Sequence, residues 1–273
     1  MGWNYLGIIC AVCAVLCAVG FYKFVYFLSV GYGFAIAGGS IAVSVIALSQ
    51  GWAAGREWLL ILQTVLFIAY GARLSGFLLV RELKNASYRK TLKEATGNDK
   101  KMPFFVLLTI WISVTVLYTA QLSPVFFRYF NAGEGMAEGG IVLPLVGIAV
   151  SVFGIALESL ADRQKSAQKK ERPDMVATKG LYRFMRCPNY MGEITFWTGI
   201  FVAGIDIYHG IGQWLMAALA YICIVYIMIN GAQRLDRRQE KRYGNDPEYR
   251  AYADHTPIIL PLLPVSHIGK YKD

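Results

Sequence analysis

Long apolar runs, separated by short polar or basic segments, follow one another along most of the chain. Seven of them have about the 20 residues that a helix needs to cross the hydrocarbon core of a bilayer. They cover residues 5–22, 30–50, 57–80, 104–127, 139–160, 191–208 and 211–231. The pattern therefore predicts an all-α, polytopic membrane protein with seven transmembrane helices.

The first run begins close to Met1 but does not have the pattern of a cleaved signal peptide. No basic stretch precedes it, and it continues through Lys23 into further apolar sequence. Composition agrees with a membrane protein, because 56% of the residues are hydrophobic and only 16% are charged, against about 25% charged in soluble domains. We expect a single membrane domain over 1–273, almost purely apolar in 1–80 and alternating helices with amphiphilic segments in 81–264.

The formal net charge of +9 is concentrated in three segments. Lysine and arginine crowd residues 81–101, 163–186 and 234–242, whereas residues 128–138 and 206–210 contain one Arg and no Lys. Because basic loops stay in the cytoplasm, we expect the N-terminus outside and the C-terminus in the cytoplasm. A basic face suits membrane lipids with anionic headgroups or a polyanionic ligand such as a nucleotide. No segment resembles a nucleic-acid-binding module, so nucleic acid is not an expected partner.

The five cysteines do not predict a disulfide framework or a metal site. Cys10, Cys13 and Cys17 share one face of an apolar helix, and no His or carboxylate accompanies them. That arrangement is typical of small-residue packing. We expect no bound metal.

The segment from 180 to 193 places costly polar groups at the start of an apolar run. Pro188 suits the first turn of a helix, because its missing N–H would be unpaired there anyway. Asn189 and Glu193 are four residues apart and then share one face. A glutamate near a helix N-terminus is also favoured by the helix dipole alone. The two arginines of the segment favour a ligand pocket, because guanidinium groups pair with phosphate.

Two further pairs lie at helical spacing. Glu158 and Asp162 are four apart at the end of an apolar run, where like charges repel, so a functional role is favoured over coincidence. Tyr70 and Arg73 are three apart within the run 57–80. An arginine inside such a run faces a polar boundary or a cavity. The tyrosine either lies at the membrane interface or donates a hydrogen bond to a substrate carbonyl.

Arg234 and Arg238 share a face where the last apolar run continues into a charged segment. They form either a solvated helix surface or an anion-binding face.

With the motifs above, the chain resembles the steroid 5-alpha-reductase superfamily of membrane enzymes over roughly 60–264, most closely its bacterial members of unknown function. The segments that carry the resemblance are Tyr70-Gly-Ala-Arg73, Glu158-Ser-Leu-Ala-Asp162, Gly180-Leu-Tyr-Arg, Arg186-Cys-Pro-Asn-Tyr-Met-Gly-Glu193, and Arg234 to Tyr249.

The resemblance implies an NADPH-dependent membrane oxidoreductase. It would reduce a carbon–carbon double bond conjugated to a carbonyl, in a lipophilic, steroid- or isoprenoid-like substrate that enters from the bilayer. It implies substrate-side helices in 1–80, cofactor-binding helices and loops in 81–264, and a bacterial inner membrane with the cofactor on the cytoplasmic side. The implied roles are nicotinamide contacts for Asn189 and Glu193, a cofactor contact for Tyr190, ribose or adenosine contacts for Glu158 and Asp162, phosphate contacts for Arg73, Arg183, Arg234 and Arg238, and polarisation of the substrate carbonyl for Tyr70.

Two departures and two rival hypotheses accompany this interpretation. Cys187 stands where many relatives have His, and no Asp or Glu precedes Glu57. Thirteen helical residues, about 20 Å, separate Glu57 from Tyr70, so Glu57 is a poor partner for Tyr70. This weakens the case for a steroid substrate more than the case for the cofactor.

A methyltransferase of the isoprenylcysteine or phospholipid type, using S-adenosylmethionine, has a similar core motif but fewer helices and the His. A lipid-binding or scaffolding protein leaves the clustered charges without a purpose.

Overall fold

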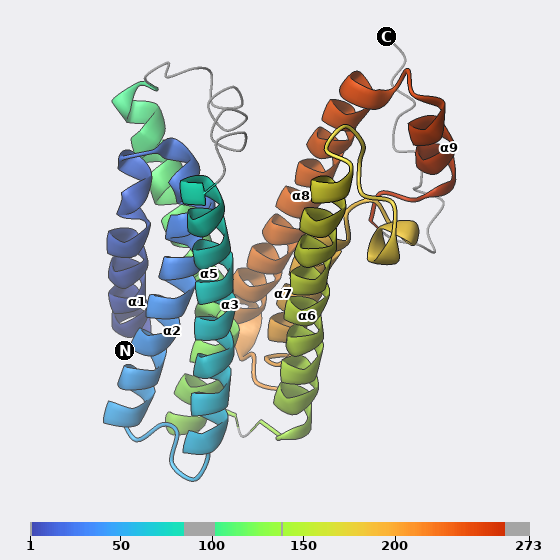
Figure 1. Cartoon of the computed structure of the whole chain (residues 1–273). Coiled ribbons are helices and arrows are strands. Elements are labelled where there is room, and N and C mark those ends of the chain that lie inside the picture. The colour runs from blue at the N-terminus through green and yellow to red at the C-terminus, as the bar shows by residue number, and fades with distance from the viewer. Residues whose placement is uncertain (1, 85–101, 138, 260–273) are drawn as a thin grey trace. The chain divides into compact units, whose positions relative to one another are not determined.

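The computed structural model describes residues 2–84, 102–137 and 139–259 (Figure 1), and every regular element in these ranges is a helix. The all-α prediction is confirmed for this part of the chain. The helices are α1 (Gly2–Cys17), α2 (Val30–Ser49), α3 (Glu57–Lys84), α5 (Phe104–Gly133), α6 (Val142–Glu171), α7 (Pro188–Val202), α8 (Gly210–Tyr243) and α9 (Pro247–His255), with short 3-10 turns η1 (Ala18–Phe21), η2 (Phe24–Leu28) and η3 (Gly180–Arg183).

Six helices in the described ranges are long and apolar enough to cross a membrane, and the chain is an integral membrane protein. They are α1 extended to Phe21, α2, α3, α5, α6 and α8. The membrane span expected over 191–208 is not among these six, because α7 has only 15 residues and ends at Val202. A helix of that length rises about 22 Å, less than the roughly 30 Å of a bilayer core.

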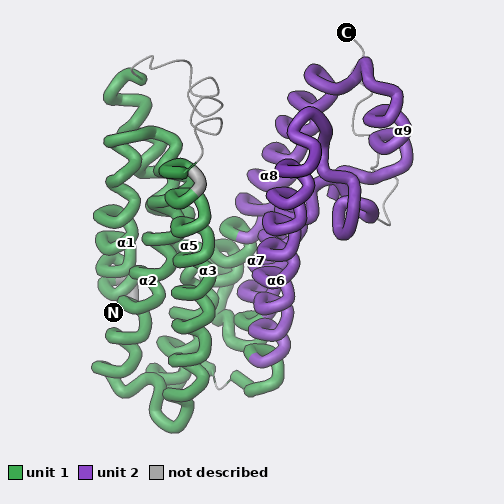
Figure 2. Tube along the Cα trace, in the orientation of Figure 1, with its two compact units in different colours: residues 1–144, 203–220 green, residues 145–202, 221–273 purple. Residues whose placement is uncertain are grey.

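Parts of two predictions lie outside the described residues. These are residues 85–101 of the basic segment 81–101, and residues 138 and 260–264 of the expected cofactor region. The described residues divide into two compact units, coloured separately in Figure 2: unit 1 is 1–144 with 203–220, and unit 2 is 145–202 with 221–273. The single domain and its division near residue 80 stay predictions.

In unit 1, α2 packs against α1, α3 and α5 (Figure 1). Glycines allow the closest approach, since a Cβ added at Gly71 would lie 2.3 Å from the Gly33 carbonyl oxygen. Ser75 Oγ donates a hydrogen bond to the Val30 carbonyl oxygen at 2.8 Å beside this contact. Small residues let membrane helices approach closely, and here they fix α3, the helix that carries Tyr70, against α2.

In unit 2, α6 and α7 approach each other in the same way. A Cβ at Gly199 would lie 2.3 Å from the Gly147 carbonyl oxygen, and one at Gly154 would lie 2.7 Å from that of Gly192. Ser151 Oγ donates to the Phe196 carbonyl oxygen at 2.9 Å. This contact fixes the start of α7 against α6, and the segment 172–187 and α9 pack next to it.

Candidate functional site

The ten predicted site residues are divided between the two units. Tyr70 and Arg73 belong to unit 1, and the other eight belong to unit 2. In unit 2 they lie along the segment 180–193 and on the helices that pack against it. Each unit is therefore described by itself.

Side chains of α6 hold the turn that begins the segment. Gly180 has a φ of +68°, which favours glycine, and a Cβ there would lie 2.4 Å from Gln164 Oε1. The same oxygen accepts a hydrogen bond from the Leu181 N–H at 2.8 Å. One turn along α6, Gln168 Oε1 accepts from the N–H groups of residues 178 and 179, both at 2.9 Å. The turn ends at Arg183, whose side chain is exposed.

Arg186 lies at the centre of the polar contacts that follow. Its guanidinium forms an ion pair with Asp236 of α8, and both residues are buried. Its N–H donates to the Pro257 carbonyl oxygen at 2.8 Å, and the Cys187 N–H donates to that of Ile258 at 2.8 Å. The chain after α9 is thereby paired with the residues just before α7. The Arg186–Asp236 pair was not predicted, because Asp236 lies between Arg234 and Arg238 in a charged segment of the sequence.

Two buried polar atoms in this region have no hydrogen-bond partner in the described ranges. They are Arg186 Nε and the Tyr249 hydroxyl of α9. Burial raises the pKa of Tyr249, so the phenol stays protonated. The Arg186 side chain lies close enough to Tyr249 to lower its pKa against the effect of burial, so the two groups share one polar position, and a polar ligand can bind to both.

The first turns of α7 hold three of the predicted cofactor-binding residues. Asn189 and Tyr190 are half-buried, and Glu193 is 4% exposed. Glu193 Oε1 accepts a hydrogen bond from Trp197 Nε1 at 3.1 Å, one turn further along the helix. Tyr190 packs against α8, where a Cβ at Gly231 would lie 2.8 Å from its ring.

The carboxylates of α6 face the same helix. Glu158 is buried, and a Cβ at Gly192 would lie 2.7 Å from the Glu158 Cβ. Gly192 immediately precedes Glu193, so the structure brings Glu158 to the α6–α7 contact that also contains Glu193. Asp162, one turn further along α6, is half-buried.

The remaining arginines of unit 2 point to the surface. Arg234 and Arg238 are exposed, whereas Asp236 between them is buried. This end of α8 therefore presents its carboxylate inward and its arginines outward. Exposed guanidinium groups are available to phosphate, but they also form an ordinary solvated surface.

Cys187 does not have the environment of a nucleophile. It lies in an apolar cluster with Ala232, Ile258 and Ile259. Burial raises the pKa of its thiol to about 12, and a protonated thiol is neither a nucleophile nor a metal ligand. Within the described ranges, no three His, Cys, Asp or Glu side chains are placed to hold a metal ion.

In unit 1, Tyr70 is fully buried in an aromatic cluster, which does not fit a tyrosine at the membrane interface. Its ring meets that of Tyr32 edge to face, with centroids 6.0 Å apart and planes at 77°. Tyr32 also stacks on Tyr118 at 4.7 Å. Arg73, one turn along α3, is half-buried.

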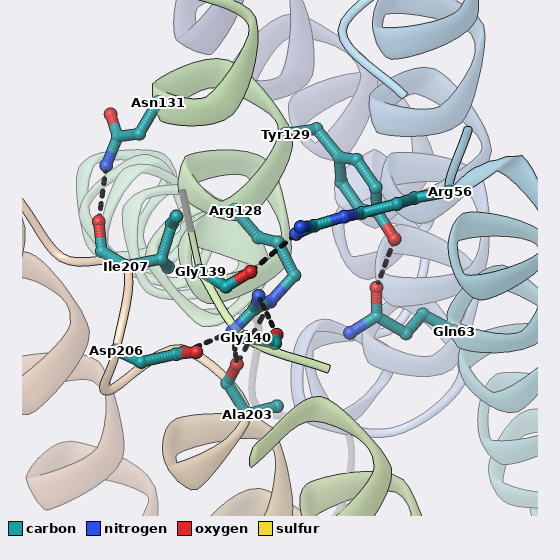
Figure 3. Close-up of polar contacts among 10 residues, drawn as sticks. All are labelled: Arg56, Gln63, Arg128, Tyr129, Asn131, Gly139, Gly140, Ala203, Asp206 and Ile207. Carbon is teal, nitrogen blue, oxygen red and sulfur yellow. Dashed lines mark hydrogen bonds and ion pairs between the residues drawn. The ribbon is translucent and has the colours of Figure 1, made fainter. Parts of the chain in front are cut away.

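Unit 1 contains a second polar group that was not predicted from the sequence. Arg128, its central residue, is the one basic residue of the segment 128–138. Figure 3 shows its guanidinium among the carbonyl oxygens of Gly140 and Ala203, with Nη1 at 3.2 Å from the first and Nε at 3.2 Å from the second. It also forms an ion pair with Asp206. These contacts join the link before α6 to the residues just after α7.

Neighbouring contacts reinforce this group. Arg56 Nη1 donates to the Gly139 carbonyl oxygen at 2.6 Å, and Asn131 Nδ2 donates to that of Ile207 at 2.7 Å (Figure 3). The carbonyl oxygens that accept these hydrogen bonds belong to the loops before α6 and after α7. The group therefore satisfies carbonyl oxygens in the turn after Val202, where the helical run expected over 191–208 has already ended.

A family model described as "Protein of unknown function (DUF1295)" matches residues 31–256. The match covers all ten predicted site residues. No curated protein and no solved structure matches the chain.

Proposed function

Because the chain belongs to the DUF1295 family, whose function is unknown, we propose a function from its own residues: NADPH-dependent reduction of a carbon–carbon double bond conjugated to a carbonyl. The substrate would be a lipophilic, steroid- or isoprenoid-like molecule from the bilayer. The observation that carries the proposal is the buried polar group around Arg186 and Glu193 at the start of α7. Buried charges in a membrane protein are costly and usually serve a function.

The residues of unit 2 fit a dinucleotide in their chemistry. Arg186 and Tyr249 are close enough to interact, and Arg186 Nε and the Tyr249 hydroxyl make no hydrogen bond to another residue in the described ranges. Asn189 and Glu193 offer amide and carboxylate groups that suit the carboxamide of a nicotinamide, and the exposed arginines suit phosphates. When bound, NADPH supplies the hydride.

Tyr70 has a separate role in the proposal. Its hydroxyl would donate a hydrogen bond to the substrate carbonyl oxygen, where negative charge develops as the double bond is reduced. A donor held in place in a dry site stabilises such charge more than one in water. Its packing against Tyr32 keeps the phenol in one orientation.

We also infer that the basic ends of α6 and α8 lie in the cytoplasm, in a bacterial inner membrane, with the N-terminus outside. Arg128 bonds to Gly140, just before α6, and to Ala203, just after α7. The chain thus leaves along α6 and returns to the same place after α7. An N-terminus outside and basic segments in the cytoplasm require the chain to cross the membrane an odd number of times. Although α7 is short, the return of the chain after α7 to the start of α6 supports such a number.

Ligand-dependent thermal stability tests the proposal. A ligand that binds the folded state stabilises it by mass action. We expect the detergent-solubilised protein to be stabilised by NADPH. Stabilisation by S-adenosylmethionine without any by NADPH would instead favour the methyltransferase hypothesis, and no response to either would favour a lipid-binding or scaffolding protein.

A further inference from the structure

One turn of α5 contains polar atoms whose hydrogen-bonding capacity is unused. Elsewhere on this helix the hydroxyl groups of Thr109, Ser113 and Thr119 bond back to the preceding turn, as Thr119 Oγ1 does to the Thr115 carbonyl oxygen at 2.8 Å. Gln121 Oε1 and Ser123 Oγ do not. Both residues are at most 2% exposed, and these two atoms have no hydrogen-bond partner in the part of the chain that the structure describes.

A proline in the same turn adds another acceptor. Pro124 lies inside α5 and has no N–H, so the carbonyl oxygen of Ala120, four residues earlier, loses its helical donor. Ala120, Gln121 and Ser123 therefore contribute three oxygen atoms to about one turn of an apolar helix. In a membrane protein such groups are normally satisfied by neighbours, water or a ligand.

Gln121 connects this turn to the predicted catalytic tyrosine. Its Nε2 donates to the Tyr32 hydroxyl at 3.2 Å, and the Tyr32 ring lies edge to face on Tyr70. If the amide were turned by 180°, its oxygen would face Tyr32 and its nitrogen would be left over. One end of the amide is unused in either orientation. A hydroxyl group, which both donates and accepts, can pair with it in both.

We propose that Gln121 forms a hydroxyl-binding position inside unit 1, beside Tyr32 and Tyr70, that takes the alcohol group of a lipophilic ligand such as a sterol or an isoprenoid alcohol. The rings of Tyr32 and Tyr118, which stack on each other at 4.7 Å, make the surroundings of this position aromatic and apolar. The identification of this ligand with the substrate rests on the proposed function, but its binding does not require NADPH. A bound water has the same hydroxyl chemistry, and the experiment separates the two.

Two probe pairs test the site by equilibrium binding to the detergent-solubilised protein. Each pair differs in one hydroxyl group: testosterone with androst-4-en-3-one, and farnesol with its deoxy analogue 2,6,10-trimethyldodeca-2,6,10-triene. For at least one pair we expect the wild-type protein to bind the alcohol about five- to tenfold more tightly, the worth of one neutral hydrogen bond. Gln121→Leu should abolish this preference by weakening the alcohol alone. Gln121→Met, which keeps the side-chain length, gives the same test if the Leu variant does not fold.

Thr119→Val is the matched control, because it removes a buried hydroxyl of α5 that is already paired within the helix. It should leave the preference unchanged. An equal preference in the wild type and Gln121→Leu, or binding of neither pair, would overturn the proposal and leave a water as the partner of Gln121.

The same samples separate this site from the proposed reaction. A preference for the alcohol that depends on Gln121, without stabilisation by NADPH, would retain the site and remove the reductase. NADPH-dependent reduction of testosterone with unchanged affinity in Gln121→Leu would retain the reductase and remove the site.

Discussion

The guanidinium of Arg186 and the carboxylate of Asp236 form an ion pair in the interior of unit 2, with side chains only 7% and 11% exposed. The pair joins the residues before α7 to α8, and the backbone of Arg186 also holds the chain that follows α9. One contact thus connects three segments that are distant in the sequence. Because the segment before α7 carries the candidate cofactor residues, this pair should control both the stability of unit 2 and the shape of that site.

We expect Asp236→Ala to lower the free energy of unfolding by about 3 kcal/mol, because it leaves the Arg186 charge buried and unpaired. The double variant Arg186→Met/Asp236→Leu should recover most of that loss, since it removes both charges. Unfolding in mixed detergent micelles, followed by circular dichroism, measures the difference. Glu248→Ala is the control, because its pair with Arg172 is exposed and should contribute little. Equal losses for Asp236→Ala and the control would contradict the prediction.

Cys187 predicts a pH dependence of stability. Burial raises the pKa of its thiol to about 12, whereas a cysteine in an unfolded chain has a pKa of about 8.5. Between these values the folded state binds more protons than the unfolded state, so the contribution is complete below about pH 8.5 and falls as the pH rises. By pH 10 the loss should reach about 2 kcal/mol.

The measurement compares wild type with Cys187→Ser in unfolding experiments from pH 7.5 to pH 10. Serine does not titrate in this range, so lysines and tyrosines that titrate in both proteins cancel. The difference in unfolding free energy between the two proteins should shrink as the pH rises. A constant difference would mean that Cys187 is accessible to solvent in the folded state.

The apolar pattern predicted the helices well, because membrane helices must be long and apolar wherever they meet lipid. It failed at Val202, where α7 ends and the next carbonyl oxygen, that of Ala203, accepts a hydrogen bond from Arg128, a residue 75 positions away. The buried pair of Arg186 was missed for a related reason. Asp236 lies among arginines in the sequence, and only the helix geometry of α8 turns it inward. Hydrophobic periodicity shows which side of a helix is buried, but it does not show which residue a buried side chain contacts.

Glu193 tests the cofactor site directly. If its carboxylate contacts the nicotinamide end, Glu193→Ala should abolish stabilisation by NADPH. Glu193→Gln keeps an oxygen for the Trp197 N–H, so it should fold normally and still weaken NADPH binding at least tenfold, roughly the worth of a hydrogen bond to a charged group. Trp197→Phe, which removes the indole donor but not the carboxylate, is the control and should retain binding. Unchanged NADPH affinity in Glu193→Ala would remove Glu193 from the cofactor site.

Tyr70 tests the chemistry apart from binding. Tyr70→Phe removes only the hydroxyl and keeps the edge-to-face contact with Tyr32, so stability and NADPH binding should stay close to wild type. If the hydroxyl stabilises the charge on the substrate carbonyl, kcat for reduction of a lipophilic enone should fall by 10²-fold or more, about the cost of losing one such donor. Tyr118→Phe is the matched control, because its hydroxyl bonds to the Phe27 carbonyl oxygen at 2.5 Å and serves packing. Normal turnover in Tyr70→Phe would exclude Tyr70 as the group that polarises the carbonyl, and a loss of similar size in Tyr118→Phe would assign the effect to the aromatic cluster as a whole.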